Sequence, residues 1–512
     1  MALTEAVTKY GVVLGQPSAN QRVSVFKGIP FAKAPVGDLR WKAPERMEPF
    51  DKPYKAYSFG PIPYQYRVPA GSMTENEFYP YKWDMSEDCL YLNVWTPARK
   101  PDEKLPVAVW IFGGGFSRGY SNKQETDGDS FARRGCVYVD FNYRLGVFGF
   151  MGSSALAKEN EHDSSGNYGL LDQMAALSWI RENISAFGGD PDRVTIFGQS
   201  AGAMSCLSLM TSPLSRDLFH QVIMESGGGL APIRFSGQRS RTVNEACGDA
   251  FLSYCNVKTL SEARSIPTDE LYRKSLSFMK EYRNNPGFWP FIDGYVIPED
   301  PNEVIRKNAL HDYPIIIGHN IREDSFNPVT PMAEARTPEE AHEWIERNKP
   351  DYAARIKDAE QLKTEEDVHR YMTFMMDRML KPGSYAFADV YTRLKKNTKL
   401  FLYRFDHVPP GGPDVGCYHS AEKMYIFETI CRTDRPMTAD DYKLSLDMAD
   451  YWSNFVKNGD PNGKGLAYWE AYDPDRPRLM ALDVNSRMED VQLDHCLKTY
   501  KDILVTDTAA LV

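Results

Sequence analysis

No run of eighteen or more apolar residues occurs in this sequence of 512 residues, so no segment is long and apolar enough to span a membrane as a helix. Repeats at a fixed period, low-complexity blocks and long runs of one charge are also missing, and no segment has the composition of a linker. Basic residues are outnumbered: 60 Lys and Arg against 70 Asp and Glu give a formal net charge of −10. That balance disfavours nucleic acid as a partner, whereas binding of a small neutral molecule is unaffected.

The beginning of the chain lacks a basic stretch followed by an apolar core, so we expect no signal peptide in the sequence as it stands. With 42% hydrophobic residues, the chain can bury a large core. We predict one domain over residues 1–512, with a helical cap at about 230–400 in which 339–347 and 365–380 have amphipathic helical patterns. Between 105 and 225, strand-length apolar runs alternate with helical stretches, which predicts an α/β fold with a mostly parallel, helix-covered sheet.

Ser200 stands in the sequence Gly-Gln-Ser-Ala-Gly, between a strand-like segment and a helical stretch rich in alanine and methionine. A strand-turn-helix junction of this kind presents a serine as a nucleophile, and Gly198 and Gly202 leave room for the sharp turn. The following helix begins with free backbone N–H groups, which makes Ala201 a candidate donor to an oxyanion. A Gly-x-Ser-x-Gly string also arises by chance about 0.1–0.2 times in a chain of this length, so its surroundings have to support the assignment.

A second glycine-rich segment supports it. The apolar, strand-like run 105–112 leads into Gly113, Gly114 and Gly115, where the backbone can approach a ligand closely. Each N–H donor aimed at the oxyanion of an acyl-transfer intermediate is worth about 2.7–4 kcal/mol. We predict that Gly114 and Gly115 form an oxyanion hole with Ala201. Taken alone, the glycines are equally well explained as a flexible turn after a strand.

Longer segments resemble type-B carboxylesterases, the family of carboxylesterases, cholinesterases and bacterial para-nitrobenzyl esterases. The resemblance runs nearly from end to end, and the segments that carry it are 26–41, 86–94, 142–146, 166–173, 187–191, 451–452 and 459–463. It implies the α/β-hydrolase fold and a triad in the chain order serine, acid, histidine. It also implies a serine carboxylesterase activity.

The resemblance also indicates the acid and the base. Glu323 follows an apolar strand-like run at the position of the family's glutamate, and His419 stands in a segment similar to the family's Gly-x-x-His-x-x-Glu. Asp324 occupies a position where the family usually has glycine, so an exchange of roles between the two acids stays open. His319 and His407 lie near these segments and are interpreted as structural histidines.

The three residue types act together in acyl transfer. A serine hydroxyl is a weak nucleophile until a neutral imidazole accepts its proton, and the carboxylate fixes the tautomer and stabilises the imidazolium. We expect hydrolysis of small to medium carboxylic esters through an acyl-enzyme, without a metal or organic cofactor. Ser226 matches a family serine that supports the acid–histidine pair, although it can equally be a turn residue at a strand end.

Departures from the family pattern bear on the substrate. Cholinesterases have glutamate just before the nucleophile; this chain has Gln199, which weighs against choline esters. Phe112 replaces the histidine or tyrosine often found ahead of the oxyanion glycines, which leaves the hydrogen bonding of that loop open. By resemblance, Phe288, Trp289 and Phe291 belong to the acyl pocket and form an apolar wall there, unless they are core residues. Further aromatic residues, candidates for the entrance to the site, are Tyr64, Tyr66, Tyr79, Tyr81 and Trp83.

The placement of cysteines bears on the compartment. Secreted family members bond the cysteine that corresponds to Cys89 to an earlier one, and no cysteine precedes Cys89 here. Cys247 and Cys255 are spaced somewhat like a second family disulfide, and a reduced pair is the alternative. We expect eight free thiols and a cytoplasmic, bacterial enzyme that is a monomer or a small homo-oligomer.

Two other functions stay open. A catalytically silent binding protein of the same fold is one, although all three triad positions are filled. The other is a lipase, which needs an amphipathic lid and an apolar landing surface. The segment before Ser86 is rich in proline, tyrosine and charged residues rather than long aliphatic ones, which favours soluble esters.

Overall fold

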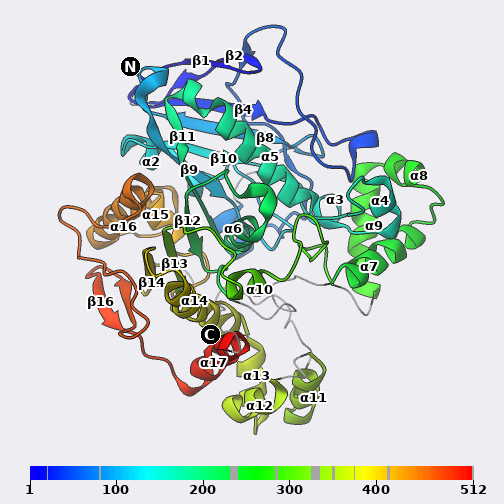
Figure 1. Cartoon of the computed structure of the whole chain (residues 1–512), viewed down its shortest axis with the longest axis vertical. Coiled ribbons are helices and arrows are strands. Elements are labelled where there is room, and N and C mark those ends of the chain that lie inside the picture. Colours follow the sequence, from blue (N-terminus) through cyan, green and yellow to red (C-terminus); the bar gives the residue numbers. More distant parts are fainter. Residues whose placement is uncertain are drawn as a thin grey trace.

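The computed structural model describes the chain except for residues 20, 80–81, 231–239, 283–285, 324–334, 349–351, 374, 412–415 and 510–512. Within the described residues, a sheet of eleven strands forms the centre of the molecule, with helices on both sides (Figure 1). Across the sheet the strands follow the order β16 (Arg487–Asp490), β15 (Arg478–Leu482), β14 (Leu400–Phe405), β13 (Ile315–Asn320), β12 (Gln221–Glu225), β11 (Gly189–Gln199), β9 (Leu105–Ile111), β10 (Val137–Phe141), β8 (Tyr91–Thr96), β4 (Ser24–Pro30) and β3 (Gln16–Pro17).

The strands from β15 to β10 run parallel, and the strands at both edges pair antiparallel. Every residue of β10 and of β13 is buried. Strands covered on both faces have continuous apolar runs rather than an alternating pattern, as 137–139 in β10 and 315–317 in β13 illustrate. The predicted mostly parallel, helix-covered sheet is therefore confirmed. Smaller sheets join β1 (Glu5–Thr8), β2 (Gly11–Leu14) and β5 (Tyr54–Lys55), and β6 (Ile62–Pro63) with β7 (Met85–Ser86).

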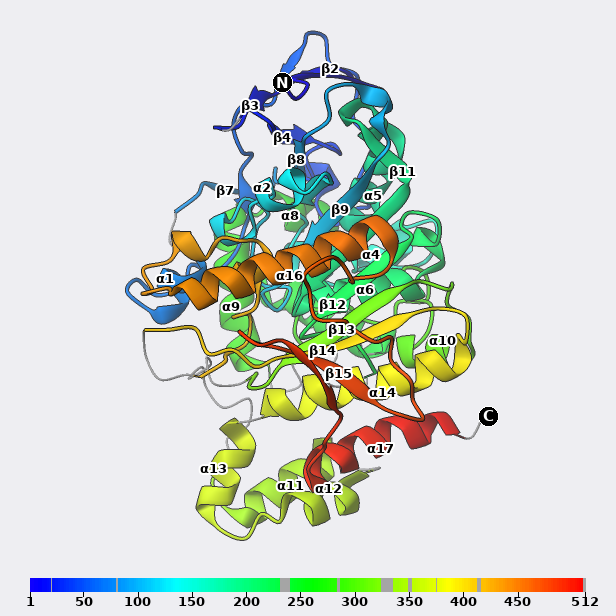
Figure 2. The same cartoon turned by 90° about the vertical axis from the view of Figure 1, so that its left-hand side faces the viewer.

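Helices cover both faces of the sheet. On one face α6 packs on β11 and β12 next to α5, and on the other face α16 crosses β9 and β11 beside α2 and α15 (Figures 1 and 2). The bounds of these and the neighbouring helices are α1 (Met73–Phe78), α2 (Asp129–Arg133), α3 (Gly146–Phe150), α4 (Ser154–Glu159), α5 (Tyr168–Asn183), α6 (Ala201–Thr211), α10 (Pro301–Arg306), α14 (Met375–Leu394), α15 (Lys423–Ile426) and α16 (Ala439–Asn458).

The described helices between 230 and 400 form separate groups. The first contains α7 (Arg241–Tyr254), α8 (Leu260–Ser265) and α9 (Thr268–Glu281), beside α4 (Figure 1). The second contains α11 (Pro338–Asn348), α12 (Ala353–Glu360) and α13 (Glu365–Thr373), which share a small apolar core with α17 (His495–Ala509). The expected helix at 339–347 is α11, and the pattern at 365–380 falls on α13 and the start of α14. Strand β13 lies between the two groups in the chain.

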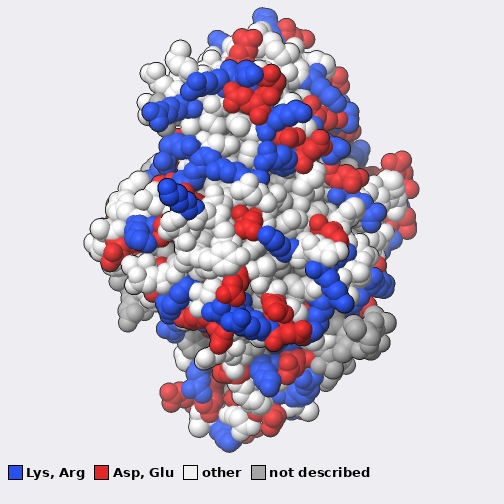
Figure 3. Space-filling model, turned by 60° about the vertical axis from the view of Figure 1, so that its left-hand side comes forward, with Lys and Arg blue, Asp and Glu red and all other residues white. Residues whose placement is uncertain are grey.

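The sequence order of the strands brings the candidate residues together. Strands β9, β11, β12 and β13 are parallel, so the loops after Ile111, Gln199, Glu225 and Asn320 leave the same edge of the sheet. Ligands bind outside the carboxyl ends of the strands in open α/β sheets. None of the described helices is long and apolar enough to cross a membrane. On the face in Figure 3, basic and acidic side chains are interspersed.

Candidate active site

Ser200 occupies a strained turn between β11 and α6. Its φ of 59° and ψ of −125° lie outside the regions that side-chain-bearing residues normally adopt. A Cβ at Gly198 would lie 2.6 Å from the Ile111 carbonyl oxygen, and one at Gly202 would lie 2.0 Å from the same atom. Both glycines are therefore required by the packing of the turn against β9. The N–H of Ser200 donates to the Glu225 carbonyl oxygen at 2.8 Å, which ties the turn to β12.

The glycine loop after β9 lies directly against this turn. A Cβ at Gly113 would be 2.2 Å from the Gln199 carbonyl oxygen and 3.0 Å from the Cβ of Ser200. Gly114 and Gly115 have φ values of +120° and +61°, in the left-handed range that favours glycine. The sequence pattern singled out Gly114 and Gly115 as donors but gave no separate role to Gly113, whose lack of a side chain brings the loop and the serine together.

The backbone N–H groups of Gly114, Gly115 and Ala201 have no acceptor among the described residues. Ala201 is the first residue of α6, where N–H groups have no partner within the helix. These three donors are thus available to a ligand. The loop is held by Tyr143, whose hydroxyl donates to the Phe112 carbonyl oxygen at 2.7 Å and whose ring stacks on Phe112 at 4.3 Å. Phe112 therefore takes part in ordering the loop through its backbone and its ring.

His419 and Glu323 meet beside the carboxyl ends of β12 and β13. His419 Nδ1 lies 2.6 Å from Glu323 Oε2, and the Glu323 side chain is fully buried. Its second oxygen, Oε1, accepts the N–H of Asn320 at 2.8 Å, and the Glu323 N–H donates to Asp377 on α14 at 2.7 Å. Burial alone raises the pKa of the Glu323 carboxyl, but the hydrogen bond and charge of His419 outweigh burial and hold that pKa below its usual range. Asp324, the alternative acid, lies outside the described residues.

The imidazole ring of His419 also contacts Gln199. The Gln199 amide nitrogen lies 3.1 Å from His419 Nε2. The same amide nitrogen lies 3.5 Å from Nδ1, so it lies over the ring rather than in line with the lone pair of either ring nitrogen. No hydrogen bond joins Ser200 Oγ to His419 among the described residues. The sequence marked Gln199 only as a replacement for a glutamate, and this contact depends on side chains far apart in the chain.

Behind the pair lies a second buried carboxyl group. Ser226 Oγ donates to Glu422 Oε1 at 3.5 Å, and Asn320 Nδ2 donates to Glu422 Oε2 at 2.6 Å. Burial, together with the charge of Glu323, raises the pKa of Glu422 to about 7. Ser226 thus reaches the Glu323 and His419 region through Glu422 rather than by direct contact. The sequence motif contained Glu422 as its final residue, but no role was predicted for it.

Of the predicted pocket aromatics, Trp289 lies nearest to the oxyanion glycines. Its ring is 3.7 Å from the Cβ position of Gly115 and packs edge-on against Phe116, with the ring centroids 5.6 Å apart. Phe288 packs against Phe251 at 5.8 Å, and the fully buried Phe291 ring is directed at Gly152 and Gly166. The contacts of Phe288 and Phe291 are therefore those of core residues.

The aromatic residues before Ser86 point in different directions. Tyr79 contacts Tyr120, at 6.0 Å between ring centroids, close to the turn that follows the glycine loop. Tyr64 donates to Asp269 on α9, and Trp83 packs on Phe59. Tyr66 is exposed, and Tyr81 lies outside the described residues.

The other two histidines near the site have structural contacts. His407 lies 2.8 Å from Asp441 and 3.0 Å from Asp483. His319 is buried, its Nδ1 lies 3.0 Å from the Asn320 carbonyl oxygen, and burial lowers its pKa to about 4. The described part of the chain contains no group of three His, Cys, Asp or Glu side chains that could hold a metal ion. No disulfide bond joins any of the eight cysteines, which all lie within the described residues, Cys247 and Cys255 included.

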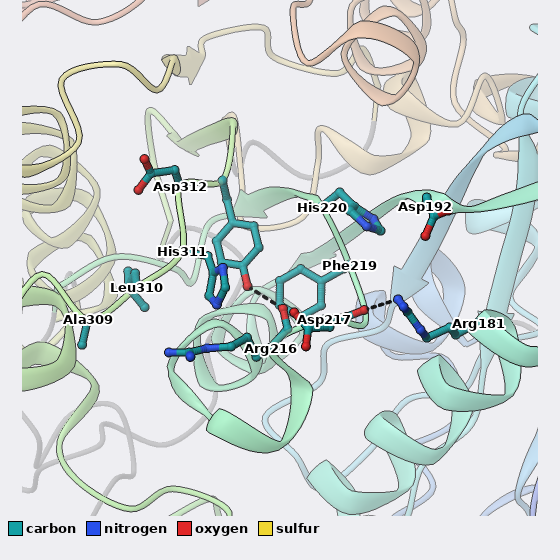
Figure 4. A pocket seen from close by; sticks show the side chains of 11 residues that line it. Arg181, Asp192, Arg216, Asp217, Phe219, His220, Ala309, Leu310, His311 and Asp312 are labelled. Atoms are coloured by element: carbon teal, nitrogen blue, oxygen red, sulfur yellow. Dashed lines mark hydrogen bonds between the residues drawn. The ribbon is translucent and has the colours of Figure 1, made fainter.

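A separate cavity of about 750 Å³ opens at the opposite edge of the sheet (Figure 4). Phe219 and His220, just before β12, and Asp312 and Tyr313, just before β13, line it. Because these residues precede the amino ends of the strands, the cavity is remote from Ser200.

Comparison with known proteins agrees with this arrangement. The sequence model described as the carboxylesterase family matches residues 3–499. The para-nitrobenzyl esterase of Bacillus subtilis (strain 168) is 33% identical over 496 residues, which cover 94% of this chain and 95% of that protein. Fumonisin B1 esterase of Sphingopyxis macrogoltabida is 32% identical over 465 residues, 88% of this chain and 82% of the relative.

Solved structures resemble the whole molecule. A thermophilic para-nitrobenzyl esterase superposes with a TM-score of 0.84 at 30% identity and covers 97% of this chain and 99% of its own. A Geobacillus stearothermophilus carboxylesterase, solved at pH 6.2, gives a TM-score of 0.80 at 30% identity, with 97% and 100% covered. These structures are α/β-hydrolases, which confirms the fold expected from the sequence.

Proposed function

Because the chain belongs to the carboxylesterase family and is a carboxylic ester hydrolase, we propose that Ser200 is its nucleophile, His419 its base and Glu323 the acid that orients the base. The observation that carries this proposal is the 2.6 Å contact between His419 Nδ1 and Glu323 Oε2, at the sheet edge where the turn presents Ser200. This contact favours the tautomer with its hydrogen on Nδ1, which leaves the lone pair on Nε2, the atom that must accept a proton.

The reaction takes two acyl-transfer steps. Ser200 Oγ attacks the ester carbonyl carbon while His419 Nε2 accepts the hydroxyl proton, and the N–H groups of Gly114, Gly115 and Ala201 stabilise the oxyanion. His419 then donates this proton to the leaving alcohol oxygen, and the acyl group stays on Ser200. Water attacks the acyl-enzyme with the same assistance, which releases the acid and restores the serine.

Gln199 has a place in this cycle. Its amide nitrogen lies 3.1 Å from His419 Nε2 and 3.5 Å from Nδ1. For the first proton transfer, Nε2 has to accept from Ser200 Oγ, and an amide over the ring leaves the in-plane lone pair of Nε2 available for this. Because an amide is neutral, it holds the ring without adding negative charge beside the imidazolium that forms during attack.

The substrates are small to medium esters. Trp289, beside Gly115, is placed to present an apolar surface to the acyl group. We also propose a cytoplasmic location. The absence of a disulfide among the eight described cysteines, six of them buried, supports it, because a reducing compartment prevents disulfide formation.

A panel of para-nitrophenyl esters, from acetate to palmitate, tests the proposed function with wild type and Ser200→Ala side by side. We expect serine-dependent turnover with a maximum at short chains. A maximum at long chains would indicate a lipase. A fluorophosphonate probe should label wild type and not Ser200→Ala; labelling of both would show that Ser200 is not the nucleophile.

A further inference from the structure

Two buried lysines share a single carboxylate near the oxyanion loop. Lys423 Nζ lies 2.7 Å from Glu125 Oε1, and Lys123 Nζ lies 3.4 Å from the same oxygen. Both lysines are more than nine-tenths buried, since Lys423 is 6% exposed and Lys123 is 9% exposed. The third cation is Arg118, which is half-buried and whose guanidinium has no hydrogen bond or ion pair to any described residue. This group of charges, Arg118, Lys123, Lys423 and Glu125, is called the cation cluster below.

Arg118 belongs to the turn that orders the oxyanion loop. Its backbone N–H donates to the Gly114 carbonyl oxygen at 3.2 Å, and its Cγ is 3.1 Å from the Cβ position of Gly114. The Gln65 side chain fixes the next residue, since it accepts the Gly119 N–H at 2.7 Å and donates to the Gly119 carbonyl oxygen at 2.9 Å. The stem of Arg118 thus lies over one of the proposed oxyanion donors.

Lys423 comes from the other side of the reacting centre. It begins α15, four residues after His419, and its backbone N–H donates to the Ser420 carbonyl oxygen. Its Nζ lies 4.7 Å from the centre of the Phe78 ring, and Phe78 in turn packs against Tyr418 at 6.4 Å. The cation cluster therefore lies along a wall that joins the oxyanion loop to the segment of His419.

Tyr79 forms the surface of that wall. Lys123 Nζ lies 4.0 Å from the centre of its ring. Burial raises the pKa of the Tyr79 hydroxyl, and the charges of Arg118 and Lys423 act in the opposite direction. Burial also lowers the pKa of the Lys123 ammonium, and Arg118 lowers it further, although Glu125 opposes both. The single negative charge of Glu125 does not balance the positive charges of the cation cluster.

The other nearby acid does not balance it either. Glu77 on α1 lies 3.0 Å from Arg435 and accepts the hydroxyl of Tyr418 at 3.2 Å, so it has its own cation. A half-buried guanidinium without a partner, beside two lysines that share one carboxylate, favours an anion supplied from outside the chain.

The chemistry of the reaction decides which part of the ester meets the cluster. His419 must protonate the leaving oxygen, so the alcohol portion lies on the side of His419. Lys423 belongs to the segment of His419, and Arg118 packs against Gly114. Trp289 and Phe116 instead lie beside Gly115. We propose that Arg118, with the positive potential of Lys123 and Lys423, forms an anion subsite that binds a carboxylate carried by the alcohol portion of the substrate. This inference rests on the proposed function and names its substrate class.

Two esters that differ only in charge test the subsite. They are 4-acetoxybenzoate and its methyl ester, which have the same acetyl group and the same phenolic leaving oxygen. The measurement is the ratio of kcat/KM for the anionic ester to that for the methyl ester. In Arg118→Ala we expect this ratio to fall by at least about fivefold, as loss of a charge-assisted hydrogen bond predicts. Increasing salt should lower the wild-type ratio as well.

The controls separate the subsite from general damage. Arg216→Ala removes an exposed arginine from the cavity at the opposite edge of the sheet and should leave the ratio unchanged. Inhibition of methyl ester hydrolysis by 4-hydroxybenzoate gives a binding readout, and its Ki should rise in Arg118→Ala. If Arg118→Ala changes the ratio of the two kcat/KM values by less than about fivefold and leaves the Ki unchanged, the proposed anion subsite is wrong. Persistent hydrolysis of both esters by Ser200→Ala would instead overturn the proposed function.

Discussion

His419 Nδ1 and Glu323 Oε2 lie 2.6 Å apart, although 96 residues separate them in the chain. Two parallel strands, β13 and β14, end at the same edge of the sheet, and the loops after them carry the two side chains. The fold thus orients the imidazole of His419 through Glu323, and five predictions follow from the residues around it.

Replacement of Ser200 by alanine should lower turnover by about a million-fold, as removal of a triad nucleophile does. The substitution removes one oxygen and leaves the turn intact, so the melting temperature should stay close to that of wild type. Steady-state kinetics on para-nitrophenyl acetate measure the effect. Residual activity within tenfold of wild type would rule out Ser200 as nucleophile.

Glu323→Gln keeps the shape of the acid but removes its charge. The imidazolium then loses its stabilising carboxylate, and the amide favours the wrong tautomer, so kcat should fall by about 10⁴-fold. Glu45→Gln, on the surface next to Lys33, is the matched control and should change kcat by less than about twofold. Equal activity of the two variants would show that Glu323 does not orient the base.

Gln199→Glu should shift the pH dependence of kcat/KM. A carboxylate beside His419 stabilises the imidazolium, so a higher pH is needed to obtain the neutral base, and the acid limb should move up by about one unit. Gln199→Leu, which adds no charge, should not move it upward. Profiles recorded with a neutral ester measure the limb, and coincident profiles for wild type and Gln199→Glu would contradict the contact.

Gly113→Ala tests the approach of the glycine loop to the turn. The added Cβ would lie 2.2 Å from the Gln199 carbonyl oxygen, so loop and turn must separate. Displaced oxyanion donors should lower kcat by about 10²–10³-fold. In Gly135→Ala the added Cβ meets nothing within 4 Å, and activity should be retained despite a small loss of stability. Full activity of Gly113→Ala would contradict the close packing.

The pH dependence of stability should depend on Glu422. Burial raises the pKa of this carboxyl to about 7, above the ~4.3 of an exposed glutamate. Folding favours the protonated form, so the carboxyl destabilises the protein progressively as the pH rises from about 4 toward 7. Glu422→Gln is neutral at every pH, and its melting temperature relative to wild type should rise between about pH 5 and pH 8. Scanning fluorimetry measures this difference, and a constant difference would contradict a buried, protonated carboxyl.

The local sequence was sufficient to predict the structure where steric contacts between neighbouring residues determine it. Gly198 and Gly202 around Ser200 predict the turn because no Cβ fits there. The glycines after β9 predict a loop whose backbone N–H groups are accessible to a ligand. The apolar runs predicted the parallel sheet because strands buried on both faces need them. Resemblance then indicated Glu323 and His419, whose placement relative to each other depends on the sheet.

Side-chain contacts between distant segments were decided by the tertiary structure. The sequence by itself determined that Gln199 precedes the nucleophile and that Phe288, Trp289 and Phe291 are close in the chain. Only the folded sheet brought Gln199 to His419, directed Trp289 toward Gly115 and left Phe291 in the core. The contacts of Lys123 and Lys423 with Glu125 have the same origin. Which of several nearby side chains meets a distant partner depends on packing across strands and helices, and spacing along the chain does not determine that.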